Sequence, residues 1–272
     1  MTAPDLSHLG PLWLVGCGNM GGALLARWLR CGLKPEDVTI IDPSPKALPA
    51  GIDLRVVGQP PEGEQPDILV LAVKPQMLGA VAGRLRVRCG AGQLVLSILA
   101  GTRTATLKGL FGGCWVVRAM PNTPARLGKG STALFAAETN ASTRATAEAL
   151  MAAAGHVHWL DDERLFDAVT ALSGSGPAYV FRMIEALEAA GTSLGLPADL
   201  AAALARETVV GAGALVEDCT APPAVLRAEV TSPGGTTQAG LEALDGDGDL
   251  SELIERTLQA AAERSAELGR TP

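Results

Sequence analysis

The feature of this sequence that most constrains its fold is a glycine-rich turn between an apolar run and an amphipathic segment. Gly16-Cys17-Gly18-Asn19-Met20-Gly21 has the spacing G-x-G-x-x-G and directly follows the apolar residues Leu12 to Val15. Apolar residues at helical spacing continue over 19–31. Such glycines permit a tight turn, close approach of the backbone to a pyrophosphate and close packing of helix on strand. The context therefore predicts a strand, a turn and a helix that bind a dinucleotide.

Further apolar runs of strand length alternate with helical segments as far as residue 160. After the first, the predicted strands cover 38–41, 68–73, 94–99, 114–120, 131–136 and 156–160. Alternating strands and helices are typical of a parallel sheet covered by helices on both faces. We therefore expect an α/β fold, a Rossmann-type doubly wound parallel sheet that forms a dinucleotide-binding domain over residues 1–161.

The pattern changes after Asp161, where Ala- and Leu-rich periodic segments replace the strand-like runs. The predicted helices of this half cover 163–171, 177–194, 198–218, 236–245 and 250–268. Small alanine side chains let helices approach closely, which suits packing within a chain or between chains. We expect an all-α domain over residues 162–272.

Composition excludes several functions. The 272 residues include 22 Lys and Arg, 29 Asp and Glu and few aromatic side chains, so a nucleic-acid binder is not expected. The net charge is +5 over residues 1–160 and −12 over the remainder, which indicates either solvated helix faces or an anionic ligand of the first half. No apolar run reaches the roughly 20 residues of a membrane span, and no signal-peptide layout is seen. We therefore expect no membrane association and a cytoplasmic location.

Three patterns of possible chemistry are incomplete. The five cysteines form no C-x-x-C pair, and His156 and His158 have no ligands at recognised spacing, so no metal is expected. The run Asp245 to Asp249 begins like a calcium loop, but Leu250 stands where glycine is required. Ser173-Gly174-Ser175-Gly176 lacks the leading glycine of a nucleophilic serine turn, which favours a helix-entry turn over a hydrolase.

Asp42 ends the second predicted strand, where an acid accepts from a ribose hydroxyl and repels a 2′-phosphate. This position slightly favours NADH. Ser44 and Lys46 lie just beyond and are candidates to contact such a phosphate, and the alternative for Asp42 is a turn-forming residue before Pro43. The cofactor is therefore expected to be NADPH or NADH.

Two further turns should line the cofactor, because ligands of an open parallel sheet bind at the carboxyl ends of its strands. They are Ala72-Val73-Lys74-Pro75 and Ala100-Gly101, and Lys74 is either a ribose or phosphate contact or a solvated lysine. In the second half, Ser232-Pro233-Gly234-Gly235-Thr236-Thr237 opens the helix predicted at 236–245. Amides at a helix N-terminus suit a carboxylate ligand, and the alternative is a capped helix start.

With these motifs in place, the chain resembles the pyrroline-5-carboxylate reductase family over essentially its whole length. The resemblance rests on Gly16 to Gly21, Ala72 to Pro75, Arg118 to Pro124 (RAMPNTP), Leu172 to Tyr179 (LSGSGPAY) and Val230 to Thr237 (VTSPGGTT). It departs from the family at Asp42, where many members carry a neutral residue, and over Leu226 to Glu229.

The resemblance implies reduction of 1-pyrroline-5-carboxylate, a cyclic imine, to L-proline by hydride transfer from NADPH or NADH. It also implies a Rossmann domain followed by an all-α dimerisation domain, and hence a homodimer or a higher homo-oligomer. The residues it places at the substrate are Ser232, Gly234, Gly235, Thr236, Thr237 and Asn122. The residues expected at the cofactor, from the motifs above together with the resemblance, are Gly16, Cys17, Gly18, Asn19, Met20, Gly21, Asp42, Ser44, Ala72, Val73, Lys74, Pro75, Ala100, Gly101, Asn122 and Thr123.

Thr237 is the catalytic candidate, because the resemblance directs its hydroxyl toward the ring nitrogen of the substrate. Two other functions fit part of the sequence. A 3-hydroxyacid dehydrogenase-like reductase shares the domain order, but that family uses a lysine of its second domain, and no lysine follows Lys129 here. A non-catalytic dinucleotide-sensing protein would need only the first half.

Overall fold

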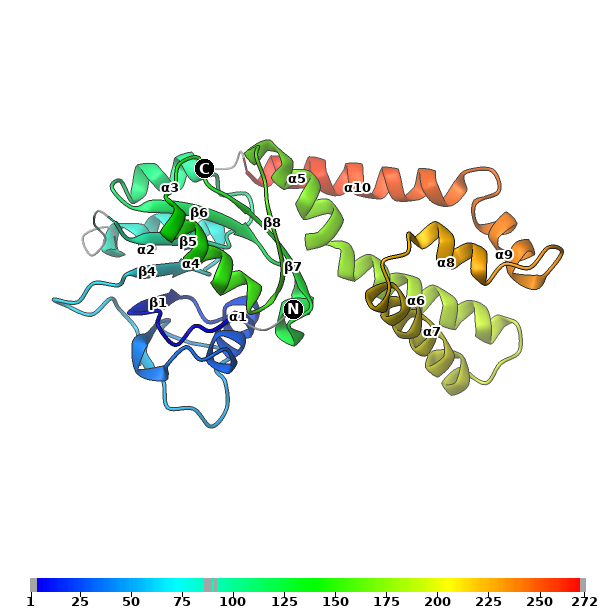
Figure 1. Cartoon of the computed structure of the whole chain (residues 1–272), viewed down its shortest axis with the longest axis horizontal. Coiled ribbons are helices and arrows are strands. Elements are labelled where there is room, and N and C mark those ends of the chain that lie inside the picture. The colour runs from blue at the N-terminus through cyan, green and yellow to red at the C-terminus, as the bar shows by residue number, and fades with distance from the viewer. Residues whose placement is uncertain (1–3, 86–89, 91, 270–272) are drawn as a thin grey trace. The chain divides into compact units, whose positions relative to one another are not determined.

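The structure, a computed structural model, describes residues 4–85, 90 and 92–269 and contains two compact units (Figure 1). The sheet unit comprises residues 1–175 and 261–272, and the helical unit comprises residues 176–260. The sequence placed the division after residue 161. The units divide later because residues 162–175 bind to the sheet unit, through hydrogen bonds such as that from Asn122 to the Ser173 carbonyl.

One eight-stranded sheet forms the centre of the sheet unit, with strand order β3-β2-β1-β4-β5-β6-β7-β8. The strands are β1 (Leu12–Val15), β2 (Val38–Ile41), β3 (Arg55–Val57), β4 (Ile68–Leu71), β5 (Leu94–Ser97), β6 (Trp115–Met120), β7 (Gly130–Phe135) and β8 (Gly155–Trp159). The order reverses between β1 and β4, where the chain crosses from one half of the sheet to the other. In open α/β sheets this point is the ligand-binding crevice.

All neighbouring strands are parallel except β6 and β7, which are antiparallel. The sequence predicted a parallel sheet, and the observed sheet is mostly parallel with one antiparallel pair. The cause is the short connection over residues 121–129, which lacks the long crossover that a parallel pair requires. The sequence also missed β3, because its three residues are exposed or half-buried and have no apolar pattern.

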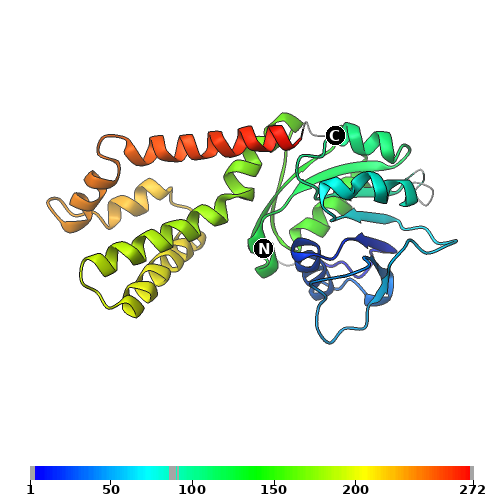
Figure 2. The same cartoon turned by 180° about the vertical axis from the view of Figure 1, so that it is seen from behind.

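Helices cover both faces of the sheet (Figures 1 and 2). On one face, α1 (Asn19–Arg30) and α4 (Ala141–Ala152) bury Trp28 and Leu150 against the sheet. On the other, α2 (Leu78–Leu85) and α3 (Thr104–Leu110) bury Leu85 and Leu107. Because both faces are covered, the central strands are continuous apolar runs. The sequence over residues 76–88 predicts a helix between the strands at 68–73 and 94–99. The structure shows this helix as far as Leu85, and positions 86–88 lie outside the described residues.

Residues 176–260, every one of which the structure describes, form the helical unit and contain no strand. Its helices are α6 (Gly176–Ser193), α7 (Ala198–Asp218), α8 (Pro223–Glu229), α9 (Thr236–Asp245) and the first part of α10 (Asp249–Leu268). α6 and α7 pack side by side as a hairpin (Figure 2). The helix predicted at 163–171 is instead a 3-10 turn (Glu163–Leu165), one turn of α5 (Phe166–Val169) and a π-turn (Thr170–Gly174). In the described part of the chain, no helix is long and apolar enough to cross a membrane.

Candidate active site

Each glycine of the turn between β1 and α1 has its own structural reason. Gly16 has a φ of 91°, and a Cβ added to it would lie 2.8 Å from the Ala72 carbonyl oxygen. A Cβ on Gly21 would lie 2.5 Å from the Gly16 carbonyl oxygen, so helix and turn pack without space for a side chain. A Cβ on Gly18 meets nothing within 4 Å. Open space above Gly18 leaves the backbone accessible to a ligand, as a pyrophosphate site requires.

The carboxylate of Asp42 joins this turn to the end of β2. Its Oδ2 accepts from the backbone N–H of Cys17 at 2.7 Å, and its Oδ1 accepts from the backbone N–H of Ser44 at 2.8 Å. Asp42 thus shapes the turn, which was the alternative interpretation of this residue. It also lines the adjoining cavity, so a turn role and a ligand role are compatible.

Cys17 is a buried packing residue of the same turn. Its thiol donates to the Ala47 carbonyl at 3.6 Å, and a backbone N–H of Lys46 donates to the Cys17 carbonyl at 3.0 Å. Burial raises the pKa of the Cys17 thiol, and the nearby charge of Asp42 raises it further. The thiol therefore stays protonated near neutral pH, and Cys17 contributes to the site through its backbone.

A cavity of about 520 Å³ opens at the carboxyl ends of β1, β2 and β4. Its volume falls within the roughly 300–1,000 Å³ of ligand pockets. The predicted cofactor residues that line it are Gly16, Gly18, Asp42, Ser44, Ala72, Val73 and Lys74. The sequence thus predicted one side of this cavity.

The opposite side of the cavity comes from residues that the sequence analysis missed. They are Gly58, Gln59 and Pro60 after β3, Met77 before α2, and Ala80, Val81 and Arg84 on α2. Arg84 donates to the Gln59 side chain at 2.7 Å and so links the two segments. The sequence contains a turn signal at Gly58-Gln59-Pro60. Its position beside the cavity cannot be deduced, however, unless β3 is known. Lys46, Lys74 and Arg84 bring three cationic side chains to the cavity, which suits a phosphate-bearing ligand.

Asn122 uses both ends of its side-chain amide within the protein. Its Nδ2 donates to the Ser173 carbonyl at 3.1 Å, and its Oδ1 accepts from the Ser131 backbone N–H at 2.9 Å. Asn122 thereby joins the end of β6 to the start of β7 and to the π-turn. Thr123, the next residue, is exposed. Contact of either residue with a nicotinamide stays a prediction, as does contact of the exposed Pro75 and Ala100.

The loop before α9 uses its own amides internally and leads into the first turn of that helix. Gly234 has a φ of 68°, and its backbone N–H donates to the Gln238 side chain at 2.7 Å. The N–H of Gly235 donates to the Ser232 carbonyl at 3.0 Å. These two amides are therefore used inside the loop, and those of Thr236 and Thr237 in the first turn of α9 remain for a ligand, since the first amides of a helix lack intrahelical acceptors. The supporting Gln238 was missed because its partner is a backbone group.

Two of the three incomplete patterns form local structure. The Ser173 hydroxyl donates to the Val169 carbonyl at 3.1 Å within the π-turn. Asp245 accepts from the backbone N–H and the hydroxyl of Ser251, both at 3.1 Å, and so connects α9 with α10. Over residues 4–85, 90 and 92–269, no three metal-ligating side chains form a cluster.

Comparison with known proteins assigns the chain to a family. The family described as pyrroline-5-carboxylate reductase dimerisation matches residues 163–268, and the one described as NADP oxidoreductase, coenzyme F420-dependent, matches residues 12–101. Pyrroline-5-carboxylate reductase of Pseudomonas aeruginosa is 40% identical over 260 residues, which cover 93% of this chain and 95% of that protein. The enzyme of Synechocystis is 41% identical and covers 95% of this chain and 98% of its own.

Solved structures agree with these matches. The pyrroline-5-carboxylate reductase of Coxiella burnetii superposes with a TM-score of 0.87 at 32% identity, over 97% of this chain and all of that one. The Plasmodium falciparum enzyme, solved with NADP bound, gives a TM-score of 0.83 at 29% identity, over 97% of this chain and 99% of its own. The chain belongs to the pyrroline-5-carboxylate reductase family.

Proposed function

We propose that this protein reduces 1-pyrroline-5-carboxylate to L-proline with NADPH or NADH, the last step of proline biosynthesis. The observation that carries the proposal is the pairing, in one chain of this family, of two ligand sites. One is the dinucleotide cavity above Gly18, and the other is the loop that presents the amides of Thr236 and Thr237. The relatives that match over nearly the whole chain carry this enzyme name.

The residues present fit the cofactor. The open space at Gly18 and the N-terminus of α1 accept a pyrophosphate, and Lys46, Lys74 and Arg84 supply positive charge nearby. When bound, the reduced nicotinamide supplies the hydride. The Ala100–Gly101 turn at the end of β5 is the element that we assign to the nicotinamide ribose.

The substrate is held by amides and hydroxyls. The backbone N–H groups of Thr236 and Thr237 bind its carboxylate, and Gln238 fixes the loop by accepting from Gly234. The Thr237 hydroxyl hydrogen-bonds the ring nitrogen. If the imine is protonated in water before it binds, hydride adds to C5 of the iminium and leaves the neutral amine. Positioning therefore provides most of the rate enhancement, and a strong protein acid is not required.

Asp42 slightly favours NADH over NADPH, because its carboxylate lies where a 2′-phosphate would add negative charge. Ser44 and Lys46 line the same cavity and favour the phosphate. Titration of both nucleotides against wild type and Asp42→Ser tests the preference. Since Asp42 also holds the Cys17 amide, the informative quantity is the ratio of the two dissociation constants. A ratio that stays unchanged would contradict the assignment.

The protein acts as a homodimer or a higher homo-oligomer formed through its helical unit. Apolar side chains on α6 and α7 are exposed in the single chain, among them Val180, Phe181, Leu204, Val210 and Leu215. Exposed apolar side chains gathered on neighbouring helices mark a protein–protein contact surface. The dimerisation family matches this same region. The cytoplasmic location stays a prediction.

Oxidation of NADPH and NADH tests the function against its alternatives. Oxidation of NADPH or NADH is measured with 1-pyrroline-5-carboxylate and with semialdehydes, and reduction of NADP+ or NAD+ is measured with 3-hydroxyacids. We expect turnover with the cyclic imine alone. Turnover with the hydroxyacids or semialdehydes would favour the 3-hydroxyacid dehydrogenase-like alternative. Nucleotide binding without any turnover would favour a dinucleotide sensor.

A further inference from the structure

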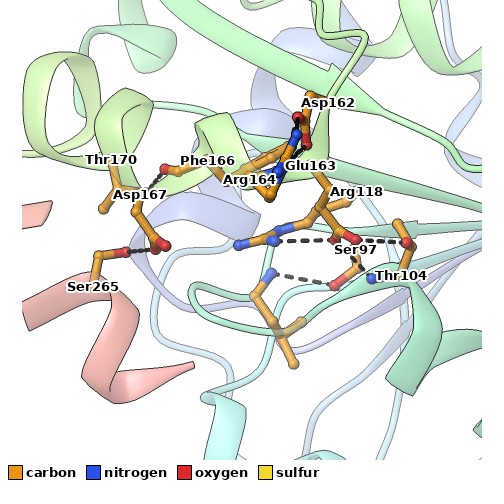
Figure 3. Close-up of polar contacts among 11 residues, drawn as sticks. Ser97, Thr104, Arg118, Asp162, Glu163, Arg164, Phe166, Asp167, Thr170 and Ser265 are labelled. Carbon is orange, nitrogen blue, oxygen red and sulfur yellow. Dashed lines mark hydrogen bonds and ion pairs between the residues drawn. The ribbon is translucent and has the colours of Figure 1, made fainter. Parts of the chain in front are cut away.

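The carboxylate of Glu163 caps α3 from a distant part of the chain. Its Oε1 accepts from the Thr104 backbone N–H at 2.8 Å, and its Oε2 accepts from the Thr104 hydroxyl at 2.9 Å (Figure 3). Arg103, the residue before the helix, makes no side-chain capping bond. Glu163 thus satisfies an amide that a cap residue usually satisfies, and its negative charge lies at the favourable end of the helix.

Arg118 holds this carboxylate in place. Its Nη1 donates to Glu163 Oε1 at 3.1 Å, and its guanidinium lies 4.0 Å from the centre of the Phe166 ring. The Arg118 side chain is only 6% exposed. Burial lowers the pKa of the Arg118 guanidinium, and the hydrogen bond to Glu163 opposes that shift. Buried ion pairs contribute little net stability compared with apolar packing, so the value of this pair lies in the geometry that it fixes.

The turn between β5 and α3 is held from a second side by the end of α10. Gly101 has a φ of 71°, and a Cβ added to it would lie 3.2 Å from the Cα of Gly269. α10 is anchored in turn, because the Ser265 hydroxyl donates to Asp167 Oδ1 at 2.7 Å (Figure 3). Asp167 and Glu163 lie four residues apart. The segment from Glu163 to Asp167 therefore contains both of the side chains that support the Ala100–Gly101 turn.

We propose that Glu163, held by Arg118, is a positioning residue for the nicotinamide half of the cofactor. It acts by fixing the Ala100–Gly101 turn, and the inference rests on the proposed function. β5 lies beyond β4, in the half of the sheet that receives the second mononucleotide. The 520 Å³ cavity lies on the β1–β2 side, and neither Thr104 nor Arg118 lines it. Loss of Glu163 should therefore affect one half of the cofactor and not the other.

Binding of two nucleotides separates these halves. NADPH and NADH reach the Ala100–Gly101 turn, whereas ADP, which lacks the nicotinamide and its ribose, reaches only the 520 Å³ cavity. Dissociation constants are measured for the full-length wild type and for Glu163→Ala, Glu163→Gln, Thr104→Val and Thr104→Ser. The matched control is Asp161→Ala, since Asp161 is an exposed acid two residues before Glu163.

For Glu163→Ala we expect the dissociation constant of NADPH and NADH to rise about tenfold, since a charged hydrogen bond is lost, and that of ADP to stay within about twofold. Glu163→Gln keeps an acceptor for the Thr104 amide and gives a smaller rise. Thr104→Val gives a smaller rise again, and Thr104→Ser, which keeps the hydroxyl, binds like wild type. Asp161→Ala binds all three nucleotides normally.

Two results with the Glu163 variants would overturn the inference. Equal weakening of ADP and the complete cofactors would show that Glu163 supports only the general scaffold, and unchanged binding of NADPH and NADH would show no role at all. Because the readout is binding, a wild type that binds nucleotide without reducing 1-pyrroline-5-carboxylate would contradict the proposed function alone. A wild type that binds neither NADPH nor NADH would contradict both.

Discussion

The sheet unit and the helical unit differ in how they complete their apolar cores. In the sheet unit, helices of the same unit bury both faces of the sheet, with Leu14 and Val70 in one cluster and Leu69 and Val95 in the other. Over residues 176–260, all of which the structure describes, only Ala201 and Ala205 are buried. The sheet unit thus has a complete core within one chain. The helical unit obtains its core by association, because exposed apolar area is the main driving force for assembly.

The chemistry divides along the same line. In the proposed function, the sheet unit offers cationic side chains and an open backbone to a nucleotide, and the helical unit offers amides and hydroxyls to a small acid. A change in one unit should therefore alter one ligand or one assembly step while the other is preserved. The following predictions test that separation.

The largest effect is expected from Phe181→Glu on α6. Phe181 is 60% exposed in the single chain, and a charge buried in a dimer contact costs more than the lost apolar burial alone. We expect the dissociation constant of the dimer to rise at least about 100-fold, or about 2.7 kcal/mol, by sedimentation equilibrium. Nucleotide binding by the sheet unit should be retained. Phe181→Leu is the control and should stay dimeric. An unchanged dissociation constant for the Phe181→Glu dimer would contradict the claim that the helical unit completes its core by association.

The glycine turn allows binding to be separated from stability within the sheet unit. A Cβ on Gly18 meets no protein atom within 4 Å, so Gly18→Ala should change the free energy of unfolding by less than about 0.5 kcal/mol. It should weaken NADPH and NADH binding at least about tenfold, since the Cβ occupies space meant for the pyrophosphate. Gly21→Ala should instead destabilise the protein by roughly 1–3 kcal/mol, because its Cβ meets the Gly16 carbonyl. Calorimetry measures both quantities, and normal nucleotide affinity in Gly18→Ala would refute the site.

Thr237→Ala tests the helical unit in the complementary way. Removal of the hydroxyl should lower kcat for 1-pyrroline-5-carboxylate about tenfold, the value of one hydrogen bond of roughly 1.4 kcal/mol. The dissociation constant of NADPH should not change. Thr237→Ser restores the hydroxyl and most of the activity. Kinetics of Thr237→Ala identical to wild type would remove the residue from the mechanism.

The smallest effect concerns pH. Because the pKa of Cys17 is raised in the folded state, the folded protein holds the thiol proton more tightly than the unfolded chain, whose thiol titrates near 9.0. The contribution of the protonated Cys17 thiol to the free energy of unfolding is thus complete below about pH 9. It is lost as the pH rises through the pKa of the thiol in the folded state. Between pH 8 and pH 10, the free energy of unfolding, measured by urea denaturation, should fall more for wild type than for Cys17→Ala. Cys219→Ala, which changes an exposed cysteine of the helical unit, should behave like wild type. Parallel pH profiles for all three proteins would contradict the assignment.

Local patterns in the sequence predicted most of the fold. The turn at Gly16 to Gly21, the long apolar strands and the periodic helices each depend on neighbouring residues, and the structure confirms those elements. β3 has too few residues for a pattern, and the direction of β7 follows from the length of a connection. The existence of β3 and the direction of β7 depend on the assembled sheet and not on the local sequence.

The candidate site shows the same limit. Gly16, Gly18 and Asp42 were predictable because motif and strand end place them together. Glu163 and its partner Thr104 are 59 residues apart, and no spacing rule connects them. Asn122 was predicted at the ligands, yet its side chain is committed to Ser131 and Ser173. Only the assembled structure shows such long-range partners.

Transfer of isotope from cofactor to product tests the central claim most directly. The protein is incubated with 1-pyrroline-5-carboxylate and with NADPH or NADH that carries deuterium at the transferred position, and the product is analysed by mass spectrometry. We predict L-proline that carries one deuterium at C5, since hydride adds to the imine carbon. Oxidation of the nucleotide without labelled L-proline, or no reaction with either nucleotide, would contradict the account.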